Sequence, residues 1–492
     1  MRPPLIKYYT YQDEFDIHIS KEFCEHHIKK IITTYSKKTI FEAISTISIK
    51  FSISNDPVHV LNVQKELLNI PIESNVFIFH RQATITIYQF LYQFEDGEYG
   101  DSEKINWKDI FLLYIIINSF LDLYETINYT ISLYKKIFFG NIKNYQFTSN
   151  ANDLLADYEL FKDYYENIDD KDKIRYDEII FDKINLHLTE YIAALELIRN
   201  YNHPNIFEFF ENYAVVNFAE TNKAWVSREP KFDIPFEIPF FQRKPLIKFN
   251  TSHFLIDANF LLNSMSRIVY ESLCEYDYQG FKSNWGEIVE QVIKTRLREI
   301  FTHKECREIK VQSINNQYAD FGLVSNNNIY LFEIKTSVIN TTTLYTNNYH
   351  AFKKYYNDKF ILKEGVCQQI KMLEKIESDY KKFCEFSKID KNNEYTIYPI
   401  LLVFDETLQA FGACHYNSTM FDILMHHRKL SPTNYDLSNH HTTITFHEIF
   451  KLKLLGKSKE ELIDFVQLYA NQQIKPMMSF SLFLQEQRNN TD

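Results

Sequence analysis

Two acidic residues and one lysine, Asp320, Glu333 and Lys335, have the types and the spacing for chemistry on a phosphate group. Carboxylate oxygens are ligands that Mg²⁺ prefers, and this ion commonly joins one or two carboxylates to a substrate phosphate. A lysine beside such an ion can stabilise the negative charge that develops during hydrolysis. The three residues therefore indicate metal-assisted cleavage of a phosphodiester. The alternative is a salt-bridged patch in which Lys335 only neutralises the two acids.

A predicted β-hairpin brings these three side chains to one place. Residues 318–324 and 329–337 have β-type composition, and the Ser-Asn-Asn-Asn sequence between them is typical of a turn. A turn centred in the middle of that sequence places Asp320 opposite Glu333. Side chains alternate along a strand, so Lys335 shares the face of Glu333. Because like charges on facing strands repel each other, we expect a positive charge to compensate them.

Two more polar residues lie on the apolar side of helices predicted before and after the hairpin. Glu290 borders an apolar stripe on a helix that is expected to begin at a capping box of Asn284 and Glu287 and to end near Phe301. Gln369 lies on the buried face of a later helix, where its amide needs hydrogen-bond partners. Both residues are candidates for the site. The ordinary alternatives are a solvated acid at the rim of the stripe and a core glutamine bonded to backbone.

Residues 286–405 resemble the PD-(D/E)XK nuclease superfamily in the order of their predicted elements, which is helix, strand, hairpin strand, helix and strand. The residues that carry the resemblance are 286–290 (GEIVE) on the first helix, Asp320 at the first acidic position, Glu333-Ile334-Lys335 at the (D/E)-X-K position and Gln369 on the second helix. Tyrosine and alanine precede Asp320 in place of the family's nominal proline, and a long segment separates Lys335 from the second helix.

The resemblance implies a role for each of these residues. Asp320 and Glu333 would bind Mg²⁺ with help from the carbonyl of Ile334, and Glu290 would bind a metal directly or through water. Lys335 would orient or activate the attacking water and stabilise the developing charge. The glutamine of the second helix would position that helix or the scissile strand. Mn²⁺ is expected to substitute for Mg²⁺.

The activity that the resemblance implies is that of a Mg²⁺-dependent endonuclease, with DNA as the expected substrate and restriction or phage defence as the expected setting. The residues themselves do not separate DNA from RNA, because the metal acts on the phosphodiester. The alternative is a catalytically inactive module that keeps the nuclease fold and binds nucleic acid or a protein partner. Residues 1–225 are expected to recognise the substrate or that partner, and the sequence leaves a homo-oligomer open.

The elements around these residues predict an α/β and α+β multidomain protein. The predicted parts are an α+β region (1–105), a helical bundle (106–225), a proline-rich linker (226–250) and a C-terminal domain (251–492). For this last domain, the resemblance implies a nuclease with a restriction-endonuclease-like core (286–405), a mixed central sheet flanked by helices. Within the first part, the runs expected to be strands are 47–53, 75–80 and 83–88. A turn is expected near Gly280 and a short helix at 460–470.

Composition limits the classes of function. The net charge of −11 disfavours a protein that coats duplex nucleic acid, although it is compatible with a local basic groove. No glycine-rich phosphate loop occurs, so ATP hydrolysis is not expected. The six cysteines are expected to be reduced core thiols, and the histidine pairs 426–427 and 440–441 are expected in exposed loops. No signal peptide is visible and the apolar run 110–121 is too short for a bilayer, so we expect a cytoplasmic protein without membrane contact.

Overall fold

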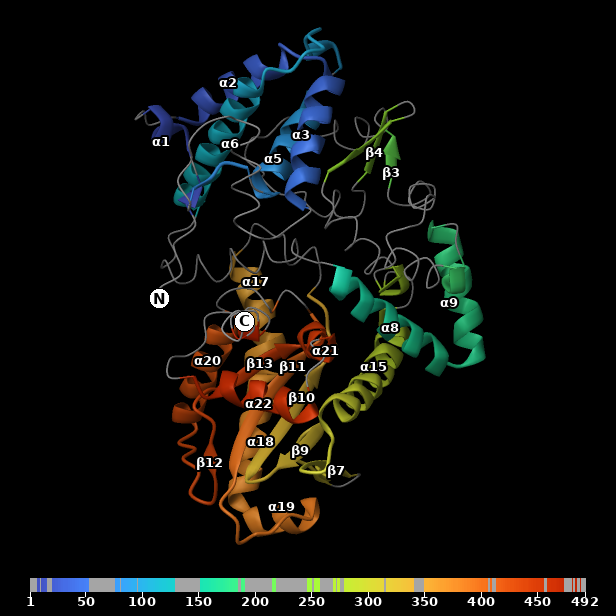
Figure 1. The fold of residues 1–492 in the computed structure, drawn as a ribbon, viewed down its shortest axis with the longest axis vertical. Helices are drawn as coiled ribbons and strands as arrows, with labels where there is room; N and C mark the ends of the chain where they lie inside the picture. The colour runs from blue at the N-terminus through green and yellow to red at the C-terminus, as the bar shows by residue number, and fades with distance from the viewer. Residues whose placement is uncertain are drawn as a thin grey trace. The chain divides into compact units, whose positions relative to one another are not determined.

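Figure 1 shows the fold of the chain in a computed structural model. The structure describes residues 20–52, 76–128, 151–190, 246–256, 278–339, 349–405, 413–454 and 458–472, apart from gaps of one or two residues, together with short pieces outside these ranges. Its contacts define two compact units: unit 1 comprises residues 1–132, 147–154 and 180–272, and unit 2 comprises residues 133–146, 155–179 and 273–492. None of the helices described has the length and apolar character that a bilayer crossing requires.

Unit 1 is mainly helical in its described residues. Its helices are α1 (Tyr11–Phe15), α2 (Lys21–Ile32), α3 (Lys37–Ser52), α5 (Arg81–Gln93) and α6 (Trp107–Asn128), with the short η1 (Asp96–Glu98). Its strands form two small sheets, β1 (Lys7–Tyr8) with β2 (Val76–Phe77), and β3 (Val215–Asn217) with β4 (Leu246–Phe249) and β5 (Ser252–Leu255). Apolar residues of α6 such as Ile110, Leu113 and Ile117 are buried, and this helix packs against α2 and α5.

Two of the three strands predicted in the first region are wrong, because residues 47–52 belong to α3 and residues 83–88 belong to α5. Isoleucine and threonine favour strands locally. In α3, however, Ile40, Ile44 and Ile47 recur at helical spacing and are fully buried. Packing of this face therefore outweighs the local preference. The third predicted run contains the short strand β2.

Unit 2 contains a mixed sheet of six strands. They are β6 (Cys306–Glu308), β9 (Phe321–Ser325), β10 (Asn328–Lys335), β11 (Thr396–Val403), β12 (Asp436–Leu437) and β13 (Thr442–Thr445), while β7 (Gln312–Ser313) and β8 (Asn316–Gln317) form a separate pair. β6, β9 and β10 are antiparallel neighbours, whereas β10 and β11 are parallel. β12 and β13 both run parallel to β11, at its start and at its end. The mixed α/β architecture expected for this region is confirmed.

Helices flank the sheet of unit 2 (Figure 1). One group consists of α15 (Tyr278–Phe301), α21 (Phe446–Leu454) and α22 (Lys459–Ala470), where α15 contacts the other two. The other group consists of α17 (Tyr349–Tyr356), the π-helical η2 (Asn357–Leu362), α18 (Val366–Ser378), α19 (Tyr380–Ser387) and α20 (Ala413–His427). The segment from α17 to α19 connects β10 to β11, because two parallel strands need a long crossover.

Helix α8 (Ala151–Asn167) and helix α9 (Asp170–Ile184) contribute most of their length to unit 2. Both helices bond to α15. Arg296 contacts Asp163 at 2.5 Å, and Nδ2 of Asn284 donates to Asp172 at 2.7 Å. The region 106–225, which the sequence groups as one helical bundle, is thus divided between the two units.

Helix α15 begins before its predicted start, and Gly280 and Asn284 both lie inside it. The predicted turn at Gly280 and the predicted capping box of Asn284 with Glu287 are therefore wrong. Phe281 and Trp285 are both buried and stand one helical turn apart. They extend the apolar face of the helix upstream, so the helix continues past the residues that resemble a cap.

Two further predictions concern the linker and the cysteine thiols. The proline-rich linker predicted at 226–250 lies outside the described residues apart from 246–249, which form β4. None of the six cysteines forms a disulfide, and five of them are buried.

Candidate functional site

The β9–β10 hairpin forms in the predicted register. A two-residue asparagine turn joins the strands, and Asn326 has a left-handed φ of 52°, which asparagine tolerates better than most residues. The last regular pair of the ladder is Phe321 with Phe332. One further step along both strands leads to Asp320 and Glu333, the two acids that the sequence places opposite each other.

Asp320 lies where β9 leaves the regular ladder. Its backbone N–H donates to the carbonyl of Phe332 at 3.1 Å, and its carboxylate accepts the N–H of Ile334 at 2.8 Å. A side-chain oxygen therefore takes the place of a backbone carbonyl along this edge of β10. The other carboxylate oxygen accepts a hydrogen bond from Nε2 of Gln317 at 3.0 Å. These bonds fix the carboxylate of a residue that is only 8% exposed.

Glu333 and Lys335 lie at the end of β10, which pairs with β11 along its whole length. Nζ of Lys335 is 2.8 Å from Oε1 of Glu333, which confirms that the two side chains share one face of the strand. The carbonyl of Lys335 accepts the N–H of Phe404 on the β11 side. Backbone groups of successive strand residues point to opposite edges, so the carbonyl of Ile334 faces the edge at which Asp320 lies.

Helix α15 adds a third acid and a second lysine to this place. It approaches the end of β10 at Gly286, where a Cβ atom would lie 3.8 Å from Oγ1 of Thr336. One turn later, Oε1 of Glu290 is 2.5 Å from Nζ of Lys294. The Lys294 side chain is 2% exposed, whereas that of Glu290 is 31% exposed. Sequence reasoning missed Lys294, although its position one turn after an acid on the same helix is a usable signal.

The carboxyl groups of Asp320 and Glu333 are harder to ionise than usual. Burial raises the pKa of Glu333 to about 7, the negative charge of Asp320 adds to this effect, and Lys335 opposes it. Burial also raises the pKa of Asp320, a backbone N–H opposes the shift, and the charge of Glu290 adds to it. Among the residues that the structure describes, the site holds these three carboxyl groups against two ammonium groups, those of Lys294 and Lys335. It therefore has one negative charge in excess unless a carboxyl group binds a proton or a cation.

The oxygen atoms of this site have the chemistry that Mg²⁺ prefers. Glu290 and Glu333 each direct one oxygen to a lysine, and no described residue donates a hydrogen bond to the second oxygen of Glu333. As these side chains stand, no group of three His, Cys, Asp or Glu in the described ranges is arranged to hold a metal ion. The donor types and the excess negative charge fit a divalent cation, which would have to displace the lysine contacts. Asp320, Glu333, Glu290 and the carbonyl of Ile334 would then hold it.

Gln369 lies on the buried face of α18, as predicted, and is fully buried. Its amide oxygen accepts a hydrogen bond from Nε2 of His441 at 2.6 Å. This bond directs the glutamine to the segment before β13 rather than to Asp320 or Glu333. The structure thus brings Asp320, Glu333, Lys335 and Glu290 together, with the Ile334 backbone beside them, whereas Gln369 bonds to His441.

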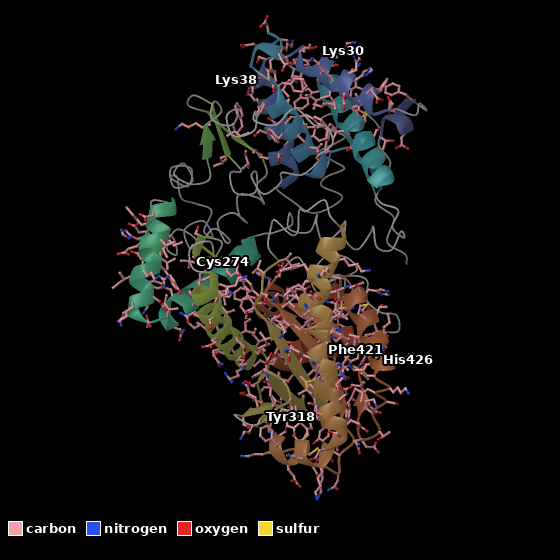
Figure 2. All side chains as sticks on the ribbon, turned by 180° about the vertical axis from the view of Figure 1, so that it is seen from behind. Lys30, Lys38, Cys274, Tyr318, Phe421 and His426 are labelled. Atoms are coloured by element: carbon pink, nitrogen blue, oxygen red, sulfur yellow. The ribbon has the colours of Figure 1, made fainter. Side chains whose placement is uncertain are left out.

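The interpretation of residues 440–441 as an exposed loop is wrong for His441, which is 2% exposed. Burial lowers the pKa of His441 to about 3, so its imidazole is neutral. Its ring stacks on Phe421 of α20, which Figure 2 labels, with 5.0 Å between the ring centroids. His426 and His427, by contrast, are exposed as predicted, but they lie in the last turn of α20 rather than in a loop. Sequence reasoning missed the buried pair of His441 and Gln369, because two adjacent histidines in a polar segment give no sign of the helices that cover one of them.

Comparison with known proteins leaves the chain without an assigned family. No protein-family model matches it, and neither a curated protein nor a solved structure does. The resemblance to the PD-(D/E)XK superfamily therefore rests on the residues of α15, the hairpin and α18 alone.

Proposed function

We propose that the chain is a Mg²⁺-dependent endonuclease that hydrolyses phosphodiester bonds of nucleic acid, with DNA as the favoured substrate. The observation that supports this proposal is the convergence of Asp320, Glu333 and Glu290 with two lysines at the end of β10, with one negative charge in excess. Buried ionisable groups that perturb one another in this way are typical of functional sites. The superfamily resemblance supports the substrate class, and restriction or phage defence is the proposed setting.

Each residue has a proposed part in the reaction. Bound Mg²⁺ would polarise the phosphate and lower the pKa of an attacking water. Asp320 is held by the Ile334 N–H, so its carboxylate keeps a fixed position at the site. Lys335 gives up its contact with Glu333 and turns to the phosphate, where its charge stabilises the charge that develops on the oxygens. Lys294 would release Glu290, which lies at the more exposed side of the site, when Glu290 binds the metal.

The proposal is tested by a cleavage assay on plasmid DNA, single-stranded DNA and RNA, with Mg²⁺, with Mn²⁺ and with a chelator. Lys335→Ala is expected to lower the cleavage rate by a factor of about 10² to 10³, the usual effect of losing one preorganised stabilising group. Lys363→Ala is the matched control, because Lys363 is an exposed lysine paired with Asp358. Full cutting by the Lys335 variant or by Asp320→Ala would refute the assignment.

A second candidate function is a non-catalytic module that keeps the fold and binds nucleic acid or a protein. The observation that favours it is the pairing of Glu333 with Lys335 and of Glu290 with Lys294, which neutralises two of the three acids without a metal. Calorimetric titration with Mg²⁺ and Mn²⁺ separates the two candidates. Absence of divalent binding at pH 8 favours the module, and binding that Glu333→Gln abolishes favours the enzyme.

A further inference from the structure

We infer that Arg307, Lys310 and Lys375 form a surface that binds the phosphate backbone of the nucleic acid beside the candidate site. We call these three residues the cationic ridge. The inference rests on the proposed function, since it takes nucleic acid as the substrate. It adds a location for the strand that flanks the scissile phosphate.

The ridge cations bond to carbonyl oxygens and ring faces rather than to carboxylates. Arg307 donates to the carbonyl of Lys388 at 2.8 Å, and Lys375 donates to the carbonyl of Gln317 at 3.2 Å. Three described arginines of unit 2 contact carboxylates instead, namely Arg296, Arg298 and Arg428. A carbonyl orients a cation without cancelling its charge. The ridge therefore keeps positive charge that a phosphate can use.

Each of the two ridge lysines lies over an aromatic ring. Nζ of Lys375 lies 4.6 Å from the ring centroid of Tyr318, and Nζ of Lys310 lies 4.8 Å from that of Phe386. The two rings are themselves in contact, with 5.6 Å between their centroids. Figure 2 labels Tyr318, which marks the position of the ridge in unit 2. Cation–π contacts of this kind fix the ammonium groups and leave their outer hydrogen atoms for an anion.

The acids of α18 and of the start of α19 are engaged in other contacts. Glu374 contacts Arg428, and Glu377 accepts hydrogen bonds from residues 433–434. Asp379 accepts a backbone N–H at the start of α19, although its charge still acts on the neighbouring Tyr318. The negative side chains of α18 thus bond to residues outside the ridge, while Lys375 on the same helix bonds to Gln317.

Gln317 connects the ridge directly to the candidate site. Its side-chain Nε2 donates to Asp320 at 3.0 Å, and its carbonyl accepts from Lys375 at 3.2 Å. Along one nucleic-acid strand the charged phosphates follow each other at a rise of about 3.4 Å in a duplex. A strand with one phosphate at Asp320 can therefore place later phosphates at Lys375 and then at Lys310 and Arg307. In a chain with a net charge of −11, such a local group of cations is what an anionic strand needs to bind.

The test measures binding of a fluorescent oligonucleotide, single-stranded and duplex, to the full chain in a chelator, so that cleavage plays no part. The variant R307Q/K310Q/K375Q is compared with K173Q/K359Q/K363Q, whose three lysines each contact an acid. Both variants lose the same charge. Each lost phosphate contact lowers the slope of log K against log salt by about 0.9, or by about 0.7 for a single strand. We expect the slope of the ridge variant to be smaller in magnitude than that of the wild type by about 2 to 3. The control variant should keep the slope of the wild type.

Two results separate this inference from the nuclease proposal. If the ridge variant binds with the salt slope of the wild type, the ridge is refuted even where Mg²⁺-dependent cleavage is observed. If the wild type binds and the ridge variant does not, the ridge is supported even where no cleavage occurs. Thermal unfolding of both variants shows that they are folded, and single substitutions of Arg307 and Lys310, which are exposed, replace the triple variant if it unfolds.

Discussion

Glu333→Gln should stabilise the metal-free protein at high pH while it abolishes function. The pKa of Glu333 is raised from 4.5 to about 7 in the folded chain. A folded state with a raised carboxyl pKa binds more protons than the unfolded state between these two values, so stability falls as the pH rises from 4.5 to 7 and stays low above it. Glutamine cannot ionise, and its oxygen can still accept the hydrogen bond from Lys335. The variant should therefore lack this loss of stability.

The size of the effect follows from the pKa. The rise of the pKa from 4.5 to about 7 corresponds to about 3.5 kcal/mol, since a tenfold change in an equilibrium constant is worth about 1.4 kcal/mol. At pH 8 we expect Glu333→Gln to be more stable than the wild type by about this amount, and at pH 4.5 or below we expect the two to be nearly equal. Denaturant unfolding measures the difference, and hydrogen exchange of β10 peptides assigns the transition to unit 2. Glu305→Gln, an exposed acid on the same unit, is the control of equal charge.

Mg²⁺ should reverse the order of the two proteins. A cation that compensates the excess charge stabilises the wild type by mass action and leaves the glutamine variant nearly unchanged. Equal stability of the two proteins at pH 8 without metal would contradict the proposed excess of buried negative charge at the site. If the wild type is less stable than the variant at pH 8, the excess negative charge lies at the site. If Mg²⁺ or Mn²⁺ then does not stabilise the wild type, the site does not bind these metals.

Three further substitutions test the elements that position the site. Gln369→Leu should destabilise the fold by about 1–3 kcal/mol because it leaves the Nε2–H of His441 without its partner, and His441→Phe added to it should recover part of this loss in denaturant unfolding. Gly365→Ala should unfold the start of α18, seen by circular dichroism, because its φ is +59° and a Cβ would meet the carbonyl of Phe360 at 2.3 Å. Asn326→Val should cost about 1–2 kcal/mol in thermal unfolding, since a β-branched residue strains a left-handed turn.

The hairpin could be predicted because its determinants are local. Four turn-forming residues fix the position of the bend, and strand alternation then fixes which side chains share a face. Asp320, Glu333 and Lys335 follow from these two facts alone. The helix of Gln369 could be predicted for the same reason, since apolar residues at helical spacing define its buried face.

The residues that were missed depend on packing between distant segments. Lys294 looks like an ordinary helical lysine until α15 is placed against the end of β10. His441 becomes buried only when Phe421 of α20, 20 residues before it, and Gln369 of α18, 72 residues before it, pack against it. The break of the ladder at Asp320, where a carboxylate replaces a backbone carbonyl, is likewise invisible in a pattern of residue types.

Protonation of Glu333 and binding of Mg²⁺ should exclude each other, and this makes the affinity for the metal depend on pH. A carboxyl group with a pKa of about 7 must release its proton before it can bind a cation. Below pH 7 the apparent affinity should therefore rise by up to about tenfold per pH unit, and above pH 7 it should level off. Calorimetry with Mg²⁺ or Mn²⁺ at pH 5.5, 6.5, 7.5 and 8.5 measures this profile, and the heat in buffers of different ionisation enthalpy counts the proton released. An affinity that is constant over this range would mean that the metal binds without Glu333, and the site would have to be placed elsewhere in the chain.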